Sequence, residues 1–458
     1  MFTMRQFGFC LLLALCLNAR ASETNSLAWH KTSSRVDADL HGQTLMPLLE
    51  EIAAKTGWRV YVEPGTTRSV SAKFKNLPSA DALRMLLGDL NFTLAPQTNA
   101  ASQLYVFTTK IQNATQLVAA KNVARKHVPN ELLVRVKPGT DIDALAKSLG
   151  AKVIGRDDKL GIYRLQFGDA AATDAALAKL KSDSDVLAVD YNYYFEPEPS
   201  PQMTTVSSGL PGPISLTLNP PTSGDPCNVT IGLIDTGIQS LGSTLDPFVM
   251  KQLSVAGDSN ANNTTTGNSL PTHATGMAET ILRAISQASG GSTTAQILPV
   301  DVYGASETTT SWNVALGIQA AVNKGANVLN LSLGSSGDSS VLDSVIQQAI
   351  ADGIVIFAAA GNSPVNTPTY PAAISGVNAV TALQQAGQLA SYANYGSFVD
   401  MALPGASVIY LNGQAYIVQG TSVSTAYATG VAAGTKTSGC AGWPQIQSAM
   451  QQKFVVPK

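Results

Sequence analysis

The sequence predicts an α/β protein whose C-terminal half forms a parallel sheet with helices on both faces, preceded by two small α+β domains. In residues 227–458, short apolar runs without polar alternation are each followed by a helical pattern, which is typical of a parallel sheet covered on both sides. Residues 34–109 and 127–194 each alternate between strand and helix patterns on a smaller scale. Residues 195–226, rich in Pro, Ser, Gly and Thr, separate these two domains from the C-terminal half.

Residues 1–21 have the pattern of a secretory signal peptide. Arg5 precedes an apolar run from Phe7 to Leu17, and Ala19-Arg20-Ala21 offers the small residues that a signal peptidase prefers. No later stretch is apolar for long enough to span a membrane. We therefore expect an exported protein, periplasmic or secreted, without a transmembrane segment.

Composition and charge exclude some classes of partner. The chain has 458 residues, of which 45% are hydrophobic and 13% charged, and its formal net charge is −2. The first 200 residues carry 23 Lys and Arg against 20 Asp and Glu, and the rest carry 6 against 11. Neither part has the basic excess of a nucleic-acid-binding protein. After loss of the signal peptide Cys227 and Cys440 remain, and in an oxidising compartment they can form a disulfide or stay as two free thiols.

Residues 34–109 predict two helices with strands around them. The first helix begins at Thr44 and ends at Gly57, and the second follows Pro78 and Ser79; WRVYVEP and RSVSAKFKN between them alternate as strands do. The pattern from VDADLHGQTLMPLLEEIAAKTG to SVSAKFKNLPSADALRMLLGDLNFTL resembles the short N-terminal domain shared by secretins and TonB-dependent receptors. This resemblance implies a Gram-negative envelope protein and an envelope partner for the module. The alternative is an unrelated small domain with the same layout.

Residues 127–194 predict four antiparallel strands backed by two helices. The strand patterns are LLVRV, KVIG, GIYRLQF and VLAVDYNYY, and the helical patterns are IDALAKSLG and ATDAALAKLKS. With VPNELLVRVKPG at its start and VLAVDYNYY at its end, this stretch resembles the prodomain of subtilisin-like proteases. The resemblance implies an intramolecular inhibitor. The following residues, 195–226, are predicted to be an exposed linker that a protease would cut.

The C-terminal half predicts a series of strands, each followed by a helix. The strand patterns are NVTIGLID, QILPVDVYG, NVLNLSLG, IVIFAAAGN and a last strand VNAVTAL, and the helical patterns are THATGMAETILRAISQ, WNVALGIQAAVNKG and SVLDSVIQQAIADG. A final helix of small residues runs from Gly420 to Gly434 and must be buried, because almost nothing on it is charged. In such a sheet, functional groups gather at the carboxyl ends of the strands.

Four polar residues stand at ends of these predicted elements. Ser422 begins the small-residue helix, where free N–H groups and the helix dipole favour developing negative charge. Asp235 and Asn362 end apolar strands, and His273, the only histidine after residue 200, begins a helix. Each alone is also explained as a helix cap, a turn residue or an exposed histidine. Together they supply a nucleophile, a base, a carboxylate to orient it and a donor for an oxyanion.

The chain order Asp, His, Ser is that of the subtilisin arrangement. The motifs in order are Asp235-Thr236-Gly237, His273-Ala274-Thr275, Ser332-Leu333-Gly334, Ala358 to Asn362, NYGSFVDMALPG and Gly420-Thr421-Ser422. This series resembles the signatures of subtilisin-like serine proteases, peptidase family S8. The resemblance implies that Asp235 orients His273, that His273 takes the proton of Ser422, and that Asn362 with the Ser422 N–H holds the oxyanion.

The same resemblance implies a polypeptide-binding surface. Ser332, Leu333 and Gly334 would form an edge strand that pairs with extended substrate. Ala358, Ala359 and Gly361 would line one wall of the S1 pocket, which fits several apolar side chains. The catalytic region is compact, so calcium loops and substrate-side insertions are expected to be missing, and no cofactor or metal site is assigned.

Some positions depart from the family pattern. Ala274, Gly276 and Glu279 stand where the family has Gly, His and Gly, and Val423 and Ala426 replace Met and Pro. None of these changes removes a catalytic atom, but they leave open how the helix behind His273 packs. The sequence therefore predicts an exported serine endopeptidase that is activated by removal of its prodomain. The alternative is a catalytically decayed fold that serves as an envelope binding or assembly module; a general esterase is disfavoured because no G-x-S-x-G elbow occurs.

Overall fold

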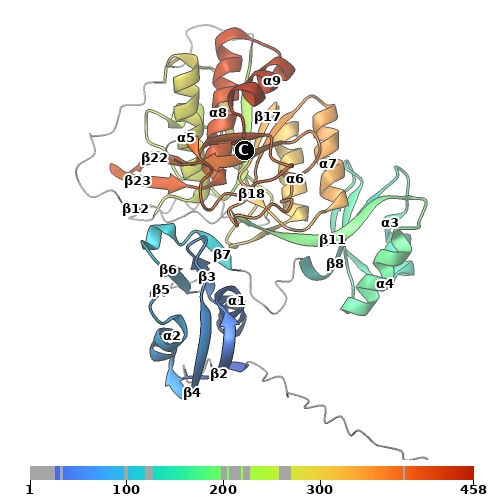
Figure 1. Cartoon of the computed structure of the whole chain (residues 1–458). Coiled ribbons are helices and arrows are strands. Elements are labelled where there is room, and N and C mark those ends of the chain that lie inside the picture. The colour runs from blue at the N-terminus through green and yellow to red at the C-terminus, as the bar shows by residue number, and fades with distance from the viewer. Residues whose placement is uncertain are drawn as a thin grey trace, which may run out of the picture. The chain divides into compact units, whose positions relative to one another are not determined.

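The structure is a computed structural model of the whole chain (Figure 1). It describes residues 26–30, 35–96, 102–118, 127–197, 204–205, 218–219, 227–256, 270–384 and 387–457. The predicted signal peptide, 1–21, lies outside these residues. The chain divides into two compact units: one holds the described residues up to Leu48 together with Thr67–Gly88, and the other holds Leu49–Thr66 and everything from Asp89 onward.

The first unit is built on an antiparallel sheet. Its strands are β1 (Ser26–His30), β2 (Arg35–Thr44) and β4 (Ser69–Pro78), in the order β1-β2-β4. Helix α2 (Ser79–Leu87) buries one face, through Ala82, Leu83, Leu86 and Leu87. Helix α1 (Leu45–Thr56) begins in this unit.

The second unit begins with the rest of α1 and a small mixed sheet. Its strands are β3 (Arg59–Val62), β5 (Asn91–Ala95), β6 (Gln103–Phe107) and β7 (Gln116–Val118), in the order β5-β6-β3-β7, with a short helix η1 (Ile111–Asn113) before β7. The stretch 34–109 thus has the predicted order of elements. Its residues are distributed over both compact units.

Residues 127–197, here called the middle domain, form an antiparallel sheet with two helices. The elements are β8 (His127–Val136), α3 (Ile142–Ser148), β9 (Lys152–Asp157), β10 (Ile162–Gln166), α4 (Ala170–Leu180) and β11 (Val186–Pro197). The strand order β11-β8-β10-β9 is the predicted four-stranded layout. Asp141 and Asp169 cap the two helices, because their carboxylates accept backbone N–H groups of the first turn. Leu132, Val134 and Leu177 pack in the cluster between helices and sheet.

Residues 227–457, here called the C-terminal domain, contain the predicted parallel sheet. Its strands are β13 (Thr230–Asp235), β14 (Leu253–Ser254), β15 (Gln296–Asp301), β17 (Val328–Leu331), β19 (Val355–Ala359), β20 (Asn378–Leu383) and β21 (Met401–Pro404), in the order β14-β15-β13-β17-β19-β20-β21. A short helix η2 (Asp246–Phe248) precedes β14.

Helices cover both faces of this sheet (Figure 1). They are α5 (His273–Ser289), α8 (Thr421–Gly439) and α9 (Trp443–Lys453) on one face, and α6 (Ser311–Asn323) and α7 (Ser340–Ala351) on the other. Leu233 packs in the cluster with α5 and α8, whereas its neighbour Ile234 packs in the cluster with α6 and α7. This is why the strand sequences show no polar alternation.

Helices α5 and α8 lie side by side and parallel (Figure 1). Gly430 lies against the backbone of Ile281, and Gly434 lies against the backbone of Ile285. A Cβ atom at Gly430 would overlap the Ile281 carbonyl oxygen, so only glycine permits this approach. The small residues of α8 therefore set the spacing of the two helices.

The prediction missed the three strands between β20 and α8, and the last helix, α9. Strand β21 extends the parallel sheet, and β22 (Ala406–Leu411) and β23 (Gln414–Gln419) form an antiparallel hairpin. Strand β21 is four residues long and ends in proline, so it carries too little pattern to be recognised. The hairpin did have a signal, because Asn412-Gly413 is a typical two-residue turn and has φ angles of 52° and 78°.

The expectation of an exposed linker from residue 195 onward is wrong for its first residues. Strand β11 continues to Pro197, and Phe195 is fully buried. Here β11 pairs with β16 (Thr309–Thr310) and with β18 (Leu333–Gly334). Composition predicted an irregular segment, but tertiary partners supply the hydrogen bonds. Residues 204–205 form β12, which pairs with β23, and most of the remaining linker lies outside the described residues.

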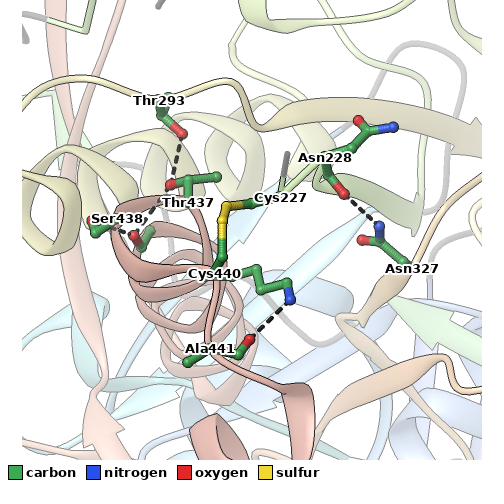
Figure 2. Close-up of a disulfide and its surroundings, with 10 residues drawn as sticks. Cys227, Asn228, Thr293, Asn327, Thr437, Ser438, Cys440 and Ala441 are labelled. Carbon is green, nitrogen blue, oxygen red and sulfur yellow. Dashed lines mark hydrogen bonds between the residues drawn. A yellow bond between two sulfur atoms is a disulfide. The ribbon is translucent and has the colours of Figure 1, made fainter. Parts of the chain in front are cut away.

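A disulfide joins Cys227 to Cys440, with Cα atoms 5.1 Å apart (Figure 2). Cys227 precedes β13, and Cys440 follows α8 in a left-handed conformation. Close by, Asn327 Nδ2 donates to the Asn228 carbonyl at 2.7 Å, and the Thr293 and Thr437 hydroxyls lie 3.2 Å apart. The bond links the start of the C-terminal domain to the end of its central helix across 213 residues.

Candidate active site

Asp235 and His273 form a buried pair at the carboxyl edge of the sheet. Asp235 is the last residue of β13 and is 1% exposed. Both of its carboxylate oxygens lie 2.8 Å from His273 Nδ1, and one of them also accepts the Thr236 backbone N–H at 2.6 Å. The His273 side chain is 7% exposed, so the ring lies deeper than its place in a polar loop suggested. The carboxylate thus fixes the orientation of the imidazole.

The local fold holds the first turn of α5 against the loop after β13. Thr272 caps the helix by accepting the Thr275 backbone N–H. The Ala274 N–H donates to Thr236 Oγ1 at 3.1 Å, and the Gln239 N–H donates to Thr275 Oγ1 at 2.9 Å. These bonds keep His273 in register with Asp235.

Ser422 is the second residue of α8 and is 2% exposed. The turn before it requires Gly420, whose φ is 135°. The Thr421 N–H donates to Asn362 Oδ1 at 2.9 Å, and the Gly361 N–H donates to Thr421 Oγ1 at 3.1 Å. The start of α8 is therefore bonded directly to the turn that carries Asn362.

A chain of buried polar side chains lies beneath Ser422. Thr429 Oγ1 donates to Asn330 Oδ1 at 3.0 Å, and Asn330 Nδ2 donates to Ser332 Oγ at 2.9 Å. Ser332 Oγ in turn donates to the Ser422 carbonyl at 3.1 Å. Asn330 and Thr429 are not among the predicted site residues, although an asparagine inside the apolar strand VLNLSLG is a recognisable signal.

The register of α5 against α8 places His273 at the level of Ser422. The contacts of Ile281 with Gly430 and of Ile285 with Gly434 both join residues 149 apart, since 430 − 281 and 434 − 285 are both 149. His273 and Ser422 have the same separation, 422 − 273 = 149. Parallel helices in this register bring the two N-terminal residues to the same end of the sheet.

Two polar atoms of the site are buried and make no hydrogen bond to the described residues. These are Asn362 Nδ2 and Ser422 Oγ. Asn362 uses its other atom, Oδ1, to accept from Thr421, which fixes the direction of the amide. A donor N–H and a hydroxyl at a helix N-terminus are thus left to interact with a reacting group.

The predicted substrate surface lies beside these groups. Leu333 and Gly334 form β18, which pairs antiparallel with Pro197 and Glu196 of β11. Ala358 packs in the apolar cluster of α6 and α7, and Ala359 and Gly361 are buried next to it.

The positions that depart from the family pattern are accommodated. Glu279 is 1% exposed and accepts hydrogen bonds from Arg283 and from the Tyr410 backbone N–H, at 2.8 Å for the latter. Burial raises its pKa, while Arg283 and the Tyr410 N–H oppose that shift. Glu279 thereby ties the His273 helix to β22. Gly276 lies close to Val418 of the same hairpin.

The described ranges hold neither a group of metal-binding residues nor a membrane-spanning helix. There, no three His, Cys, Asp or Glu residues are grouped to hold a metal ion. Likewise, none of the described helices is both long and apolar enough to cross a membrane.

Comparison with known proteins matches two parts of the chain to known families. A family model described as the subtilase family matches residues 227–454, and a model described as the fervidolysin N-terminal prodomain matches residues 113–192. Thermitase from Thermoactinomyces vulgaris is 36% identical over 205 residues, which are 44% of this chain and 72% of thermitase. The thermostable alkaline protease of Halalkalibacterium halodurans is 29% identical over 333 residues, which are 70% of this chain and 85% of that protein.

A solved structure shows the same fold. The crystal structure of fervidolysin from Fervidobacterium pennivorans, described as a keratinolytic enzyme related to subtilisin, superimposes with a TM-score of 0.55 at 19% identity. The alignment covers 72% of this chain and 57% of fervidolysin. Because the identity is low, the likeness concerns the fold alone.

Fold and relatives together define a serine endopeptidase of α/β architecture. More specifically, the chain belongs to the subtilase family, peptidase family S8. Its middle domain is of the fervidolysin prodomain type.

Proposed function

We propose that Asp235, His273 and Ser422 are the catalytic triad of an exported endopeptidase that cleaves polypeptides through an acyl-enzyme. One observation carries this proposal. His273 Nδ1 is held by both Asp235 oxygens at 2.8 Å, in a site where Ser422 Oγ and Asn362 Nδ2 are buried without a protein hydrogen bond from the described residues.

The mechanism follows from these positions. With Nδ1 donating to Asp235, Nε2 of the neutral ring is the basic nitrogen and takes the proton of Ser422 Oγ as this atom bonds to the substrate carbonyl carbon. The oxyanion accepts from Asn362 Nδ2 and the Ser422 N–H. His273 then gives the proton to the leaving amine as the C–N bond breaks. Water then attacks the acyl-enzyme in the same way, with His273 taking its proton, and the acid product is released as Ser422 regains its hydroxyl.

We further propose that the middle domain inhibits its own enzyme. The end of β11 lies where the motif Ser332-Leu333-Gly334 would hold substrate, and it runs antiparallel to β18 toward Ser332 and Ser422. The next described residues, 204–205, pair with β23, which leads into Ser422. Self-processing is therefore expected within residues 198–203, between the two paired segments. Ala359 and Gly361 would form part of the S1 wall. Ala358, also expected to line this wall, is fully buried in the apolar cluster of α6 and α7 and would support the wall from behind.

Export and envelope association belong to the same proposal. The signal pattern in residues 1–21 supports export to the periplasm or the medium. The element order of residues 34–109 supports an envelope-type docking module. Deleting residues 34–109 should leave peptidase activity intact and abolish co-purification with envelope fractions; unchanged fractionation would refute the docking role.

The test of the triad is the intact mass of exported protein, with and without a fluorophosphonate probe. Wild type should be shortened and labelled, and Ser422→Ala should be full length and unlabelled. A wild type that stays full length and unlabelled would favour the alternative of a catalytically decayed fold acting as a binding or assembly module. Glu50→Gln, on α1, serves as a control that should process normally.

A further inference from the structure

The segment Tyr392–Asn394 lies behind both halves of the proposed oxyanion site. It belongs to the loop between β20 and β21, and it touches neither Asp235 nor His273 in any bond described for it. Asn394 is 3% exposed and Tyr392 is 9% exposed. Buried polar side chains in a loop need partners, and here the partners flank the groups that bind the oxyanion.

Asn394 bonds to the turn on both sides of Asn362. Its Nδ2 donates to the Ala360 carbonyl at 2.9 Å, and its Oδ1 accepts the Ser363 N–H at 2.9 Å. Its own backbone N–H donates to the Gly361 carbonyl at 2.8 Å. The turn is therefore held immediately before and immediately after Asn362.

The side chain of Asn394 also shapes this turn. Gly361 has a φ of 113°, and a Cβ atom there would overlap Asn394 Nδ2. The amide thus occupies the space that a side chain at residue 361 would need. Asn394 Nδ2 further donates to Thr369 Oγ1 at 3.0 Å, and its carbonyl accepts from Thr381 Oγ1 at 2.6 Å. These bonds anchor the amide itself.

Tyr392 reaches the other half of the site. Its hydroxyl donates to the Gly405 carbonyl at 2.9 Å and accepts the Gly420 N–H at 3.2 Å. Gly420 begins the turn that presents the Ser422 N–H. One short segment is thus bonded to both peptide turns that carry the oxyanion donors.

We propose that Asn394 is a positioning residue for the oxyanion site: it holds the Asn362 amide where the tetrahedral intermediate forms, without touching the substrate. This proposal rests on the catalytic function proposed above. Because the donors must already point at the oxyanion when it develops, small displacements of the turn weaken transition-state binding more than ground-state binding. Asn394 should therefore affect kcat and leave KM nearly constant.

The test compares four variants of the self-processed enzyme on a chromogenic peptide anilide, succinyl-Ala-Ala-Pro-Phe-p-nitroanilide. We expect Asn394→Ala to lower kcat about 10- to 100-fold, less than the full loss of an oxyanion donor, with KM within about threefold. In an Asn362→Ala background the same change should lower kcat by no more than about twofold, because Asn394 acts through Asn362.

A matched control separates positioning from folding. Asn378 is also a buried asparagine, and its Nδ2 donates to the Ile356 carbonyl at 2.9 Å, away from the turn of Asn362. Asn378→Ala should lower the unfolding midpoint as Asn394→Ala does, with kcat within about twofold of wild type. If Asn394→Ala does not fold, Asn394→Ser, which keeps a polar group in the same space, should show the same loss of kcat in milder form.

The outcomes are distinct. An unchanged kcat in Asn394→Ala or Asn394→Ser overturns the inference, as does an equal loss of kcat in the Asn362→Ala background. A loss matched by Asn378→Ala also overturns it, because that would reflect general destabilisation. If a fluorophosphonate does not label the wild type, the proposed catalytic function is refuted. If the wild type is labelled but kcat of Asn394→Ala is unchanged, only the positioning role of Asn394 is refuted.

Discussion

The middle domain and the C-terminal domain both combine a sheet with helices, but they cover their sheets differently. The C-terminal sheet is parallel and is covered on both faces by its own helices. The middle sheet is antiparallel, and α3 and α4 cover one of its faces. On its other face Leu133, Leu160 and Ile162 join the apolar cluster of α6 and α7 in the C-terminal domain.

Polar contacts between the two domains gather along β11, which pairs with β16 and β18, and at the first turns of two helices. The Trp312 N–H in the first turn of α6 donates to Asn192 Oδ1 at 3.1 Å, and the Ser340 N–H of α7 donates to Asp190 Oδ2 at 3.2 Å. First-turn N–H groups lack partners inside their own helix. If the middle domain leaves, water can take over the hydrogen bonds of these helix N–H groups. The apolar face of the middle sheet would then be exposed to water, which is unfavourable. The C-terminal sheet is thus covered by its own helices on both faces, whereas one face of the middle sheet is covered by the C-terminal domain.

The largest expected effect concerns the disulfide of the C-terminal domain. Replacing Cys227 and Cys440 by serine should lower its free energy of unfolding by about 5 kcal/mol, because the cross-link closes a very long loop in the unfolded chain. Urea unfolding of the double variant in a Ser422→Ala background, which prevents self-digestion, measures this loss. An unchanged midpoint for the C-terminal domain would mean that the cross-link adds no stability.

The next effect concerns the contact of the middle domain with its neighbour. Phe195 is fully buried in the apolar cluster of the C-terminal domain, so Phe195→Ala should cost about 3–5 kcal/mol of docking free energy. Hydrogen exchange of β8 and β11 amides in the Ser422→Ala chain should become about 10²- to 10⁴-fold faster, while β13 and β17 stay protected. Leu187→Ala, at a 55% exposed position of the same strand, should change neither. Equal acceleration in β13 would show that the C-terminal domain depends on the middle domain as well.

A smaller effect concerns the spacing of α5 and α8. Gly430→Ala forces a methyl group against the Ile281 carbonyl and should destabilise the C-terminal domain by about 1–3 kcal/mol. Gly439→Ala, in the last turn of the same helix with no atom within 4 Å of the new methyl group, should be neutral or slightly stabilising. Urea midpoints of both variants measure the difference. Equal midpoints would show that α5 moves away at little cost.

The contrast between the domains also explains what the sequence could predict. Unbroken apolar strands followed by helices predicted the parallel sheet, and strand ends such as Asp235 predicted where polar groups gather. The structure confirms the fold and places Asp235 and His273 in contact. These features depend on local pattern and chain order. The roles of the site residues remain predictions.

The features that the sequence did not predict depend on partners far along the chain. Phe195 lies in a segment whose composition indicates a linker, and its burial comes from the C-terminal domain. Asn394 and Thr429 are polar residues whose partners, Ala360 and Asn330, cannot be identified without the fold. Glu279 departs from the family pattern, and only the position of β22 shows what it binds.

The smallest expected effect concerns the pH dependence of stability. It is tested on a buried carboxyl group of the C-terminal domain, Glu279, and on an exposed ion pair of the middle domain, Asp143 with Arg156. Burial raises the pKa of Glu279 above its ordinary value, so between these two values the native state binds more protons than the unfolded state. Native stability then falls as pH rises through that interval. Glu279→Gln, which keeps an acceptor for the Tyr410 N–H, should remove this slope.

The measurement is the urea midpoint from acid to neutral pH in the Ser422→Ala background. Relative to Glu279→Gln, the parent chain should lose stability steadily as pH rises above the ordinary range of a glutamate. Asp143→Asn breaks an exposed pair with Arg156 and should change stability by less than about 1 kcal/mol, because solvent screens such pairs. If the parent chain instead gains stability over Glu279→Gln as pH rises, the hydrogen bonds from Arg283 and Tyr410 outweigh burial. The pKa of Glu279 would then be lowered by its partners.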